Sequence, residues 1–274
     1  MNSFKVYSNT GDRLVPVDVR AFVFPGGEVQ VQCGALPERV REVRIDADLR
    51  SSDDIMALLM LTDALRRVMP SRAPLQLRMP YVPYARQDRV CNPGEALSAK
   101  VFCSLINAQG YDSVTILDPH SDVVGALIDR VSIIQPSAPA SALAERPEFA
   151  GDFALVCPDA GARKRTVGIA KALGATRIVY ADKQRDLASG RILDMTIAGG
   201  VPDVPLLVVD DICDGGATFV ELASVLRRHT DRPLYLYVSH GLFSKGLATL
   251  LDAYERIFTP NNLSGLDNER LVIL

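Results

Sequence analysis

Residues 206–226, LLVVDDICDGGATFVELASVL, change from an apolar run to acids and glycines and then to a second apolar pattern. The run Leu206–Val209 is typical of a strand that is buried on both faces of a parallel sheet. Between 220 and 226 the apolar residues recur at the spacing of one helix face. The stretch therefore predicts a strand, a loop and a helix, which form the repeating unit of α/β folds.

The loop of this unit carries features that suit a sugar phosphate. The glycines at 215 and 216 allow a tight turn, and the next amides would point outward from the start of the helix, where a phosphate is favoured. The carboxylates just upstream can accept hydrogen bonds from ribose hydroxyls or reach a metal ion through water. A helix-capping loop with solvated acids is the structural alternative, and it leaves the paired acids unexplained. We expect the ribose phosphate site to comprise Asp210, Asp211, Asp214, Gly215, Gly216, Ala217 and Thr218.

Known phosphate-binding motifs restrict the kind of loop. No Gly-Lys-Ser/Thr is present, which excludes a Walker loop, and the GxGxxG of dinucleotide-binding folds does not follow the strand. The loop instead resembles the phosphoribosyl diphosphate binding loop of the type I phosphoribosyltransferase fold, in which two acids and two apolar residues precede Asp-Thr-Gly-Gly-Thr. Gly215 and Ala217 depart from that form, the first by removing a hydroxyl donor and the second by adding a methyl group.

Composition and charge exclude several classes of protein. The chain has 274 residues, 48% of them apolar, which is enough for two moderate cores. Its 30 basic and 33 acidic side chains give a net charge of -3, and no basic block suits a nucleic acid. The five cysteines form no CxxC pair and are expected to be reduced. No apolar run approaches the roughly eighteen residues that cross a bilayer, and the N-terminus lacks a signal-peptide core, so we expect a cytoplasmic protein without membrane partners.

Alternating and periodic segments predict strands and helices along the whole chain. Residues 4–24 alternate apolar and polar positions, and the glycines at 26 and 27 predict a turn into a second strand at 28–32, so that a hairpin opens the protein. Further strands are expected at 43–45, 75–79, 113–117, 153–157, 177–180 and 234–238, and helices at 55–68, 96–108 and 166–173. Prolines accumulate between 135 and 147, where we place the boundary between two α/β domains, residues 1–140 and 141–274.

Polar clusters follow the carboxyl ends of these strands, where open parallel sheets bind ligands. The segment 80–90, PYVPYARQDRV, can stack a base and clamp a phosphate chain, although a surface turn with salt bridges is an alternative. His120 follows another strand, and such a histidine is more often structural than a metal ligand. Further clusters are PDAGARKR at 158–165, DKQR at 182–185 and Ser-His at 239–240.

Together, these clusters resemble the motifs of ribose-phosphate diphosphokinases, in the same order and over nearly the whole chain. The resembling segments are FPGGEVQVQ at 24–32, YARQDR at 84–89, DPHS at 118–121, PDAGARKR at 158–165, DKQR at 182–185 and the loop at 210–218. The resemblance implies an α/β fold of two tandem phosphoribosyltransferase-like domains, each a mainly parallel sheet flanked by helices.

The resemblance also implies a reaction, in which a diphosphate group passes from Mg-ATP to the anomeric hydroxyl of ribose 5-phosphate. The products are 5-phosphoribosyl 1-diphosphate and AMP. Attack at the β-phosphorus builds negative charge on phosphate oxygens, which positioned cations and Mg²⁺ stabilise. By resemblance, Lys183 and Arg185 are catalytic cations on a mobile loop, and His120, also counted as catalytic, holds Mg²⁺ with Asp159. The implied ATP-binding residues are Arg86, Gln87 and Asp88, with Phe24 and Glu28 supplied by a neighbouring subunit of a homo-oligomer, either a dimer or a hexamer.

Two other functions stay open. A salvage phosphoribosyltransferase would share the loop at 210–218 but would not explain the N-terminal unit. A catalytically silent paralogue that binds synthetase subunits would have no use for the charged residues kept along the chain. A second histidine, His240, lies in a segment that resembles the family's Thr-His-x-x-Phe, and we assign it either a structural role or a role in supporting the residues that contact the substrate.

Control by ADP and inorganic phosphate is not expected. In the commonest relatives an allosteric anion site uses a basic, Ser-rich turn after the nucleotide segment, whereas residues 90–95 read VCNPGE here. This turn offers no Arg, Lys or Ser side chain to an anion, and Glu95 would repel one. The sequence also stops at Leu274, where relatives continue into a terminal helix, so one wall of that site is expected to be missing.

Overall fold

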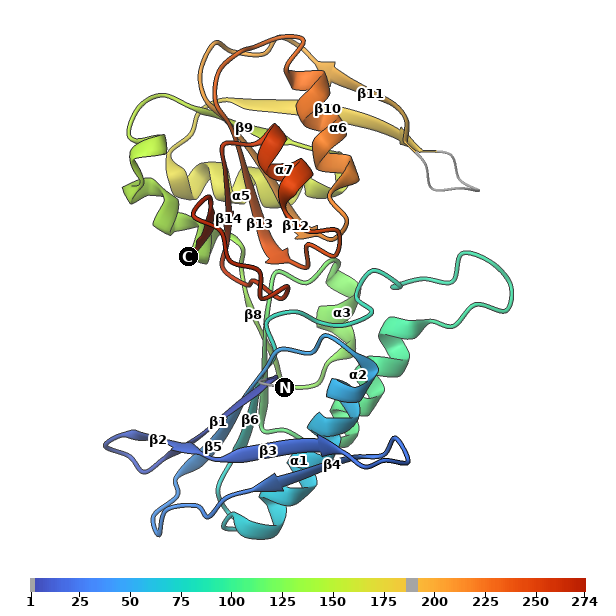
Figure 1. Ribbon diagram of the computed structural model, residues 1–274, viewed down its shortest axis with the longest axis vertical. Helices are drawn as coiled ribbons and strands as arrows, with labels where there is room; N and C mark the ends of the chain where they lie inside the picture. Colours follow the sequence, from blue (N-terminus) through green and yellow to red (C-terminus); the bar gives the residue numbers. More distant parts are fainter. Residues whose placement is uncertain (1–2, 186–191) are drawn as a thin grey trace. The chain divides into compact units, whose positions relative to one another are not determined.

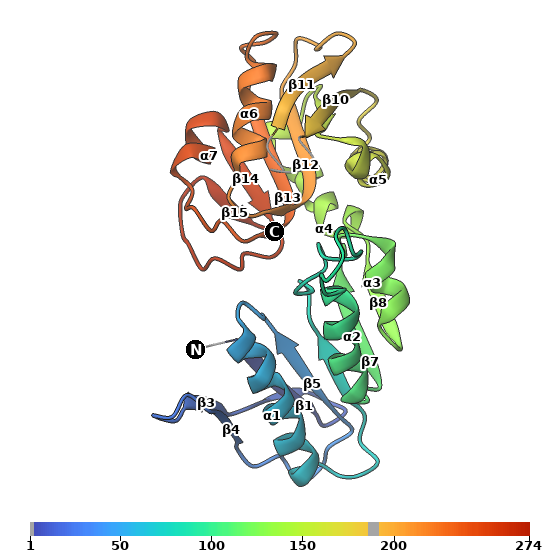
Figure 2. The same cartoon turned by 90° about the vertical axis from the view of Figure 1, so that its right-hand side faces the viewer.

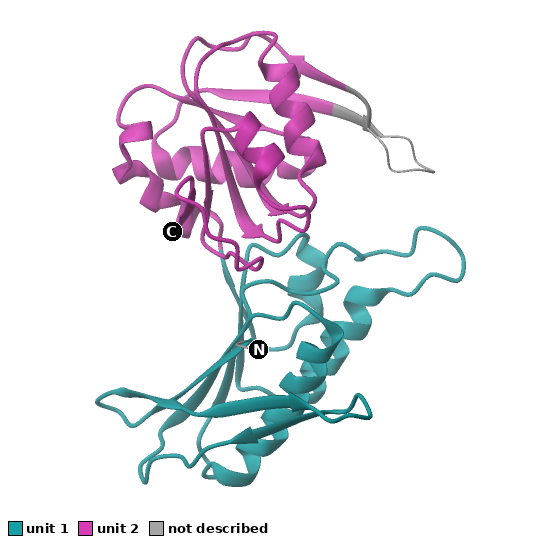
Figure 3. Ribbon diagram, viewed as in Figure 1, with its two compact units in different colours: residues 1–134 teal, residues 135–274 magenta. Residues whose placement is uncertain are grey.

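The computed structural model describes residues 3–185 and 192–274, with the side chains of 183–185 and 192–194 left out of the description. It divides the chain into two compact units, Met1–Ile134 and Gln135–Leu274 (Figure 3). The predicted boundary at 140 is therefore placed too late. The segment after 134 belongs to the second unit because helix α4 (Ser137–Ala140) and the 3₁₀ helix η1 (Ser141–Glu145) bury Ala140 and Leu143 in its core.

The first unit contains a six-stranded sheet in the order β2-β1-β5-β6-β7-β8 (Figure 1). Its strands are β1 (Phe4–Asn9), β2 (Leu14–Val17), β5 (Glu42–Ala47), β6 (Leu75–Arg78), β7 (Ser113–Leu117) and β8 (Val131–Ile134). Strands β5 to β8 are parallel, whereas β1 is antiparallel to both of its neighbours. The sheet is thus mainly parallel, as the sequence predicts.

The start of the chain differs from the single strand predicted for residues 4–24. That segment forms three strands, because a turn at Gly11, whose φ is 105°, separates β1 from β2, and β3 (Val19–Val23) follows. Strand β3 pairs with β4 (Val29–Cys33) in a separate two-stranded sheet. The turn between them contains Gly27 with φ 92°, so the predicted hairpin exists as β3–β4.

The helices of the first unit cover an apolar core. Helix α1 (Ser52–Val68) begins with a capping box between Ser51 and Asp54, and α2 (Ser98–Ala108) and α3 (Asp122–Leu127) follow later in the chain. Leu58, Leu61 and Leu65 recur at helical spacing along α1 and are fully buried. They belong to one cluster with side chains of the sheet, including Val43, Ile45 and Leu77.

The second unit contains a seven-stranded sheet in the order β11-β10-β9-β12-β13-β14-β15. The strands are β9 (Ala154–Cys157), β10 (Ile178–Arg185), β11 (Ile192–Ala198), β12 (Leu206–Cys213), β13 (Leu234–Gly241), β14 (Arg256–Thr259) and β15 (Leu271–Ile273). All neighbouring pairs are parallel except β10 and β11, which are antiparallel. Its 3₁₀ helices η2 (Pro147–Phe149) and η3 (Ala160–Ala162) flank β9.

Side chains that alternate along the central strands form two separate cores. Ala154 and Val156 face helices α6 (Ala217–Leu226) and α7 (Ala248–Ala253), whereas Leu155 faces α5 (Arg163–Leu173). Figure 2 shows α6 and α7 on one side of the sheet and α5 on the other. The second unit is therefore a three-layered α/β domain.

Two strands of this unit are longer than predicted. Strand β12 continues through Asp210 and Asp211 to Cys213, because Asp210 pairs with Val238 and Cys213 with Gly241. Strand β10 continues through the DKQR segment, which the sequence assigns to a loop, because it pairs with β11. The backbone of Lys183 and Arg185 is thus part of a strand.

The five cysteines are free thiols, as predicted. Within residues 3–185 and 192–274, no helix combines the length and the apolar character needed to span a membrane.

Candidate active site

Two adjacent carboxylates lie near the carboxyl end of the central strand β12. Asp210 and Asp211 retain 17% and 8% of their side-chain exposure. Each accepts a hydrogen bond from the next backbone amide, Asp210 from Asp211 at 2.9 Å and Asp211 from Ile212 at 2.8 Å. Such pairs of acids are expensive to bury without a cation, so their partner determines what the site can do.

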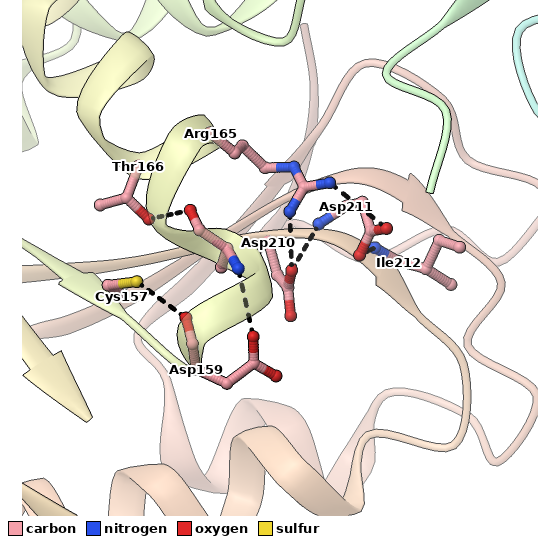
Figure 4. A network of polar contacts seen from close by, with 8 residues as sticks. Cys157, Asp159, Arg165, Thr166, Asp210, Asp211 and Ile212 are labelled. Carbon is pink, nitrogen blue, oxygen red and sulfur yellow. Dashed lines mark hydrogen bonds and ion pairs between the residues drawn. The ribbon is translucent and has the colours of Figure 1, made fainter. Parts of the chain in front are cut away.

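Arg165 supplies that cation from the first turn of α5. Its Nη1 lies 3.2 Å from Oδ1 of Asp210 and its Nη2 lies 3.3 Å from Oδ2 of Asp211, while its own side chain is only 10% exposed. Figure 4 shows the guanidinium between the two carboxylates. The sequence points to the PDAGARKR segment but not to this residue. The helical period offers a signal, because Arg165 lies one turn before the buried Ile169 and so faces the sheet.

Sharing this cation does not restore the ordinary pKa of Asp210. Burial raises the pKa of Asp210 well above its ordinary value, and the neighbouring charge of Asp211 raises it further, whereas Arg165 lowers it. The pKa of Asp210 stays raised because one guanidinium cannot offset both burial and a second carboxylate. The oxygens of the two acids can accept further hydrogen bonds, for example from vicinal hydroxyl groups.

The loop after β12 leads directly into α6. Gly216 precedes the helix with φ 78°, and a Cβ there would lie 3.0 Å from Cδ2 of Leu250, so glycine is favoured at this position. The four amides of residues 215–218 donate no hydrogen bond to any residue that the structure describes. Consecutive amides at the start of a helix favour an anion, so the loop has the donors that a phosphate needs.

The segment that follows β13 holds this loop in place. The amides of Leu242 and Phe243 donate to the carbonyl of Cys213, and the amide of Ser244 donates to the carbonyl of Asp214 at 3.1 Å. The hydroxyl of Ser244 donates to Oδ1 of Asp214 at 2.6 Å. Burial, followed by the charges of nearby carboxylates, raises the pKa of the Cys213 thiol to about 12, so this cysteine is a neutral side chain and not a nucleophile.

Asp159 lies at the same edge of the sheet, because β9 pairs in parallel with β12. It follows Cys157, the last residue of β9, by two positions and caps η3, accepting a hydrogen bond from the amide of Ala162 at 3.1 Å. The thiol of Cys157 donates to the Asp159 carbonyl at 3.1 Å (Figure 4). The charge of Asp159 also contributes to raising the pKa of Asp210. The structure thus brings together the predicted residues Asp159, Asp210 and Asp211.

The predicted catalytic cations lie on β10, the strand next to β9. The side chains of Lys183 and Arg185 fall outside the described part of the chain, so only their strand is placed. The start of this segment contacts the start of α5, since Asp182 forms an ion pair with Arg163 at 3.6 Å. Two of the predicted motifs, PDAGARKR and DKQR, are therefore neighbours in space.

In the first unit, the predicted nucleotide segment and the predicted histidine follow adjacent strands, β6 and β7. Tyr84 has φ 62° and its ring lies 6.0 Å from Phe102, and the amide of Gln87 donates to the Tyr84 carbonyl at 2.9 Å. The side chains of Arg86 and Gln87 are exposed, whereas Asp88 is partly buried and forms an ion pair with Arg89 at 3.5 Å. The side chain of His120 is exposed.

Phe24 and Glu28 face each other across the turn of the β3–β4 hairpin. The amide of Phe24 donates to the carbonyl of Glu28 at 2.8 Å, and both side chains are exposed. The ring of Phe24 meets that of Phe22 edge to face at 5.1 Å. The exposed ring of Phe24, next to the partly buried Phe22, is a surface that can stack on a ring of another molecule.

His240 is buried in the second unit. Its side chain is 2% exposed, and its Nδ1 lies 3.1 Å from Nδ2 of Asn261. Among the described residues, no group of three or more His, Cys, Asp or Glu side chains is placed to hold a metal ion. The predicted ligands His120 and Asp159 belong to different units, and each is placed only within its own unit.

Comparison with known proteins finds related sequences over most of the chain. Residues 4–110 match the model of the N-terminal domain of ribose phosphate pyrophosphokinase, which is another name for the diphosphokinases. A ribose-phosphate pyrophosphokinase of Campylobacter jejuni is 33% identical over 239 residues, an alignment that covers 85% of this chain and 73% of that protein. The chain belongs to the ribose-phosphate pyrophosphokinase family.

Some other members of the pyrophosphokinase family match a shorter part of this chain. The protein of Cereibacter sphaeroides is 36% identical over 197 residues, which cover 71% of this chain but only 57% of that relative. The crystal structure of phosphoribosylpyrophosphate synthetase from Mycobacterium smegmatis has a TM-score of 0.78 at 21% identity, covering 95% of this chain and 86% of that one. The pyrophosphokinase fold is therefore shared over both units.

Proposed function

We propose that this chain transfers a diphosphate group from ATP to the anomeric hydroxyl of ribose 5-phosphate, with AMP as the second product. The observation that carries the proposal is the end of β12, where two acids contact Arg165. They are followed by a loop whose four amides donate no hydrogen bond to any described residue. Acids that accept from vicinal hydroxyls, next to amides that bind a phosphate, suit a ribose phosphate better than a free sugar. Membership of the family supports the same assignment.

In this proposal each group of residues has one task. Asp210 and Asp211 accept hydrogen bonds from the ribose hydroxyls, and the amides of 215–218 bind the 5-phosphate. Lys183 and Arg185 neutralise the charge that builds on the transferred group. Arg86, Gln87 and Asp88 hold the ATP, and Phe24 and Glu28 complete its adenine pocket in a second copy of the chain within a cytoplasmic homo-oligomer.

The side chains at the site suit Mg²⁺. This ion prefers oxygen ligands and is usually bound through one or two carboxylates together with substrate phosphates, so it needs no dedicated cage. Asp159 would hold it in the second unit, with His120 as the proposed ligand in the first. When bound, Mg²⁺ neutralises charge on the phosphate oxygens of ATP.

A product assay tests the reaction. The purified chain is incubated with ATP, Mg²⁺ and ribose 5-phosphate, and AMP is then resolved from ADP. The proposal requires AMP and 5-phosphoribosyl 1-diphosphate in equal amounts. ADP would indicate transfer of a single phosphate, and the absence of any product would favour the silent paralogue. Consumption of added 5-phosphoribosyl 1-diphosphate with a nucleobase would favour a salvage phosphoribosyltransferase.

We expect Asp210→Asn to lose substrate affinity and gain stability. The amide can accept only one of the hydroxyl hydrogen bonds, so the KM for ribose 5-phosphate should rise about tenfold while that for ATP changes little. Because the folded-state pKa of Asp210 is raised, its contribution to stability is present below the unfolded pKa and lost as pH rises through the folded pKa. At pH 7.5, without ligands or metal, the variant should therefore melt about 2–4 °C higher than the native protein.

Calorimetry at pH 7.5 and at pH 3.5 checks this expectation. The gain should shrink at the lower pH, where Asp210 is protonated in both states. A lower melting temperature at pH 7.5 would mean that the ion pair with Arg165 outweighs the cost of burying Asp210. A collapse of ATP affinity instead would mean that Asp210 acts on the metal and not on the ribose.

We further propose that ADP and inorganic phosphate do not control the enzyme allosterically. In the turn 90–95, the carboxylate of Glu95 already accepts hydrogen bonds from the amides of Cys91 and Asn92, both at 3.0 Å. The side-chain amide of Asn92, which donates at 2.6 Å, and these backbone amides lower the pKa of Glu95, so it stays ionised at neutral pH. The backbone amides of this turn, which could otherwise bind an anion, thus already donate to the carboxylate of Glu95.

Initial rates over a matrix of ADP and ATP concentrations check this proposal. ADP should inhibit only by competing with ATP, and activity should not depend on added phosphate. Glu95→Gln removes the charge but keeps an acceptor for the turn. If native inhibition by ADP persists at saturating ATP, or if activity requires millimolar phosphate, the proposal fails.

A further inference from the structure

Lys245 lies along the loop that precedes α6. The segment 242–244 is hydrogen-bonded to Cys213 and Asp214, which brings the next residue onto Gly215. A Cβ built on Gly215 would lie 3.4 Å from both Cδ and Cε of Lys245 and 3.7 Å from its Cγ. The aliphatic stem of the lysine therefore covers the one face of the loop that a side chain at 215 would otherwise occupy.

The backbone does not require glycine at 215. Gly216 has a φ of 78°, in the left-handed region. The φ of Gly215 lies outside that region, so the backbone there tolerates any residue. A methyl group at 215 would make ordinary van der Waals contact with the lysine stem. A branched side chain such as that of threonine would extend further and clash with the stem. Glycine at 215 thus makes room for Lys245, at the position where the resembling motif has a threonine hydroxyl.

The ammonium group of Lys245 is within reach of an anion on this loop. Its Nζ lies one C–N bond of about 1.5 Å beyond Cε, and so within about 5 Å of the Cβ position of Gly215. The side chain is exposed and makes no ion pair with any residue that the structure describes. The amides of 215–218, which donate to no residue within the described part of the chain, belong to the same loop. A cation and a row of amides together suit a phosphate monoester dianion.

We infer that Lys245 binds the 5-phosphate of ribose 5-phosphate and replaces, with a charge, the hydroxyl donor that Gly215 lacks. The inference rests on the proposed function of the loop and adds a phosphate-binding residue to it. Lysine acts here as a compact point charge, so arginine should substitute in part and a neutral chain of the same length should not.

Calorimetric titration of the full chain with ribose 5-phosphate, ribose and inorganic phosphate tests the inference without ATP or turnover. Lys245→Met should weaken binding of ribose 5-phosphate about tenfold to a hundredfold, the usual worth of a hydrogen bond to a charged group. Lys245→Arg should restore part of the affinity. Lys171→Met, on the last turn of α5, is the matched control and should change nothing. In rate measurements the KM for ATP should stay the same.

The outcomes are separable. Equal affinity of native protein and Lys245→Met for ribose 5-phosphate would overturn the role of Lys245, whether or not synthesis is observed. If Lys245→Met loses affinity for ribose as much as for ribose 5-phosphate, the lysine does not contact the phosphate group. If only the KM for ATP rises, the lysine binds ATP. Either result overturns the inference. If the native protein binds no ribose 5-phosphate at all, the proposed function fails and the inference with it.

A second substitution tests the contact itself. Gly215→Val should displace the lysine stem without adding a donor, and so weaken binding as much as Lys245→Met does. The double variant Gly215→Val with Lys245→Met should be no weaker than either single variant. Losses that add in the double variant would overturn the contact between the two residues.

Discussion

Lys183→Ala and Arg185→Ala are each expected to lower kcat about a hundredfold or more while changing the KM for ribose 5-phosphate little. Each cation would meet charge that develops mainly in the transition state, so its loss should affect the chemical step and not ground-state binding. Strand β10, which carries both residues, is the neighbour of β9, whose end leads to Asp159. Steady-state kinetics with both substrates varied, together with single-turnover rates, measure the effect.

The residue between the two cations provides the matched control. Gln184→Ala alters the same strand without removing a charge, and kcat should stay within about threefold of the native value. A near-normal kcat for Arg185→Ala would show that the DKQR segment is not catalytic. An equal loss in substrate binding would show that the cations act in the ground state as well.

Much of the second unit could be predicted from the period of its apolar residues, but strand ends could not. The run Leu206–Val209 predicts β12 because such runs are buried on both faces. Its continuation through Asp210 and Asp211 depends on pairing with β13, and acids are poor strand formers by local propensity. The same holds for the DKQR segment, which is a strand because β11, a strand not predicted, pairs with it.

The domain boundary shows how tertiary packing overrides composition. Prolines between 135 and 147 predict a linker, and proline is indeed unsuited to the middle of a helix or strand. Here Pro136 precedes α4 and Pro147 begins η2, positions in which proline is compatible with a helical turn. The turns between them bury Ala140 and Leu143 against the second sheet, and this burial assigns the segment to the second unit.

The site was predictable in its motifs but not in its pairings. Asp159, Asp210 and Asp211 could be named because they follow strands that share one sheet edge. The PDAGARKR segment contains three cations, and only the structure distinguishes Arg165, which meets the acids, from Arg163, which pairs with Asp182. Lys245 lies far along the sequence from Gly215, so no local pattern predicts that they touch.

The pair of acids makes Arg165 the residue whose loss should cost the most stability. Its guanidinium contacts one oxygen of each carboxylate, and all three side chains are largely buried. Arg165→Met removes the cation that the structure places between the two carboxylates. Removing one partner of a buried ion pair destabilises a protein by about 3–5 kcal/mol, because the remaining charge is uncompensated. Urea denaturation at pH 7.5 should show a loss of this size, together with a large rise in the KM for ribose 5-phosphate.

A second substitution separates the charge from the packing of the arginine stem. Asp210→Asn in the Arg165→Met background removes one of the two carboxylates, so the double variant should regain a substantial part of the lost stability, more than Asp210→Asn adds to the native protein. Arg163→Met, in the same turn of α5 but in an exposed ion pair, should cost less than about 1 kcal/mol. If the two substitutions add independently, Arg165 stabilises the fold through its packing alone. In that case Arg165 does not position the acids of β12. The KM for ribose 5-phosphate should then change in Asp210→Asn but not in Arg165→Met.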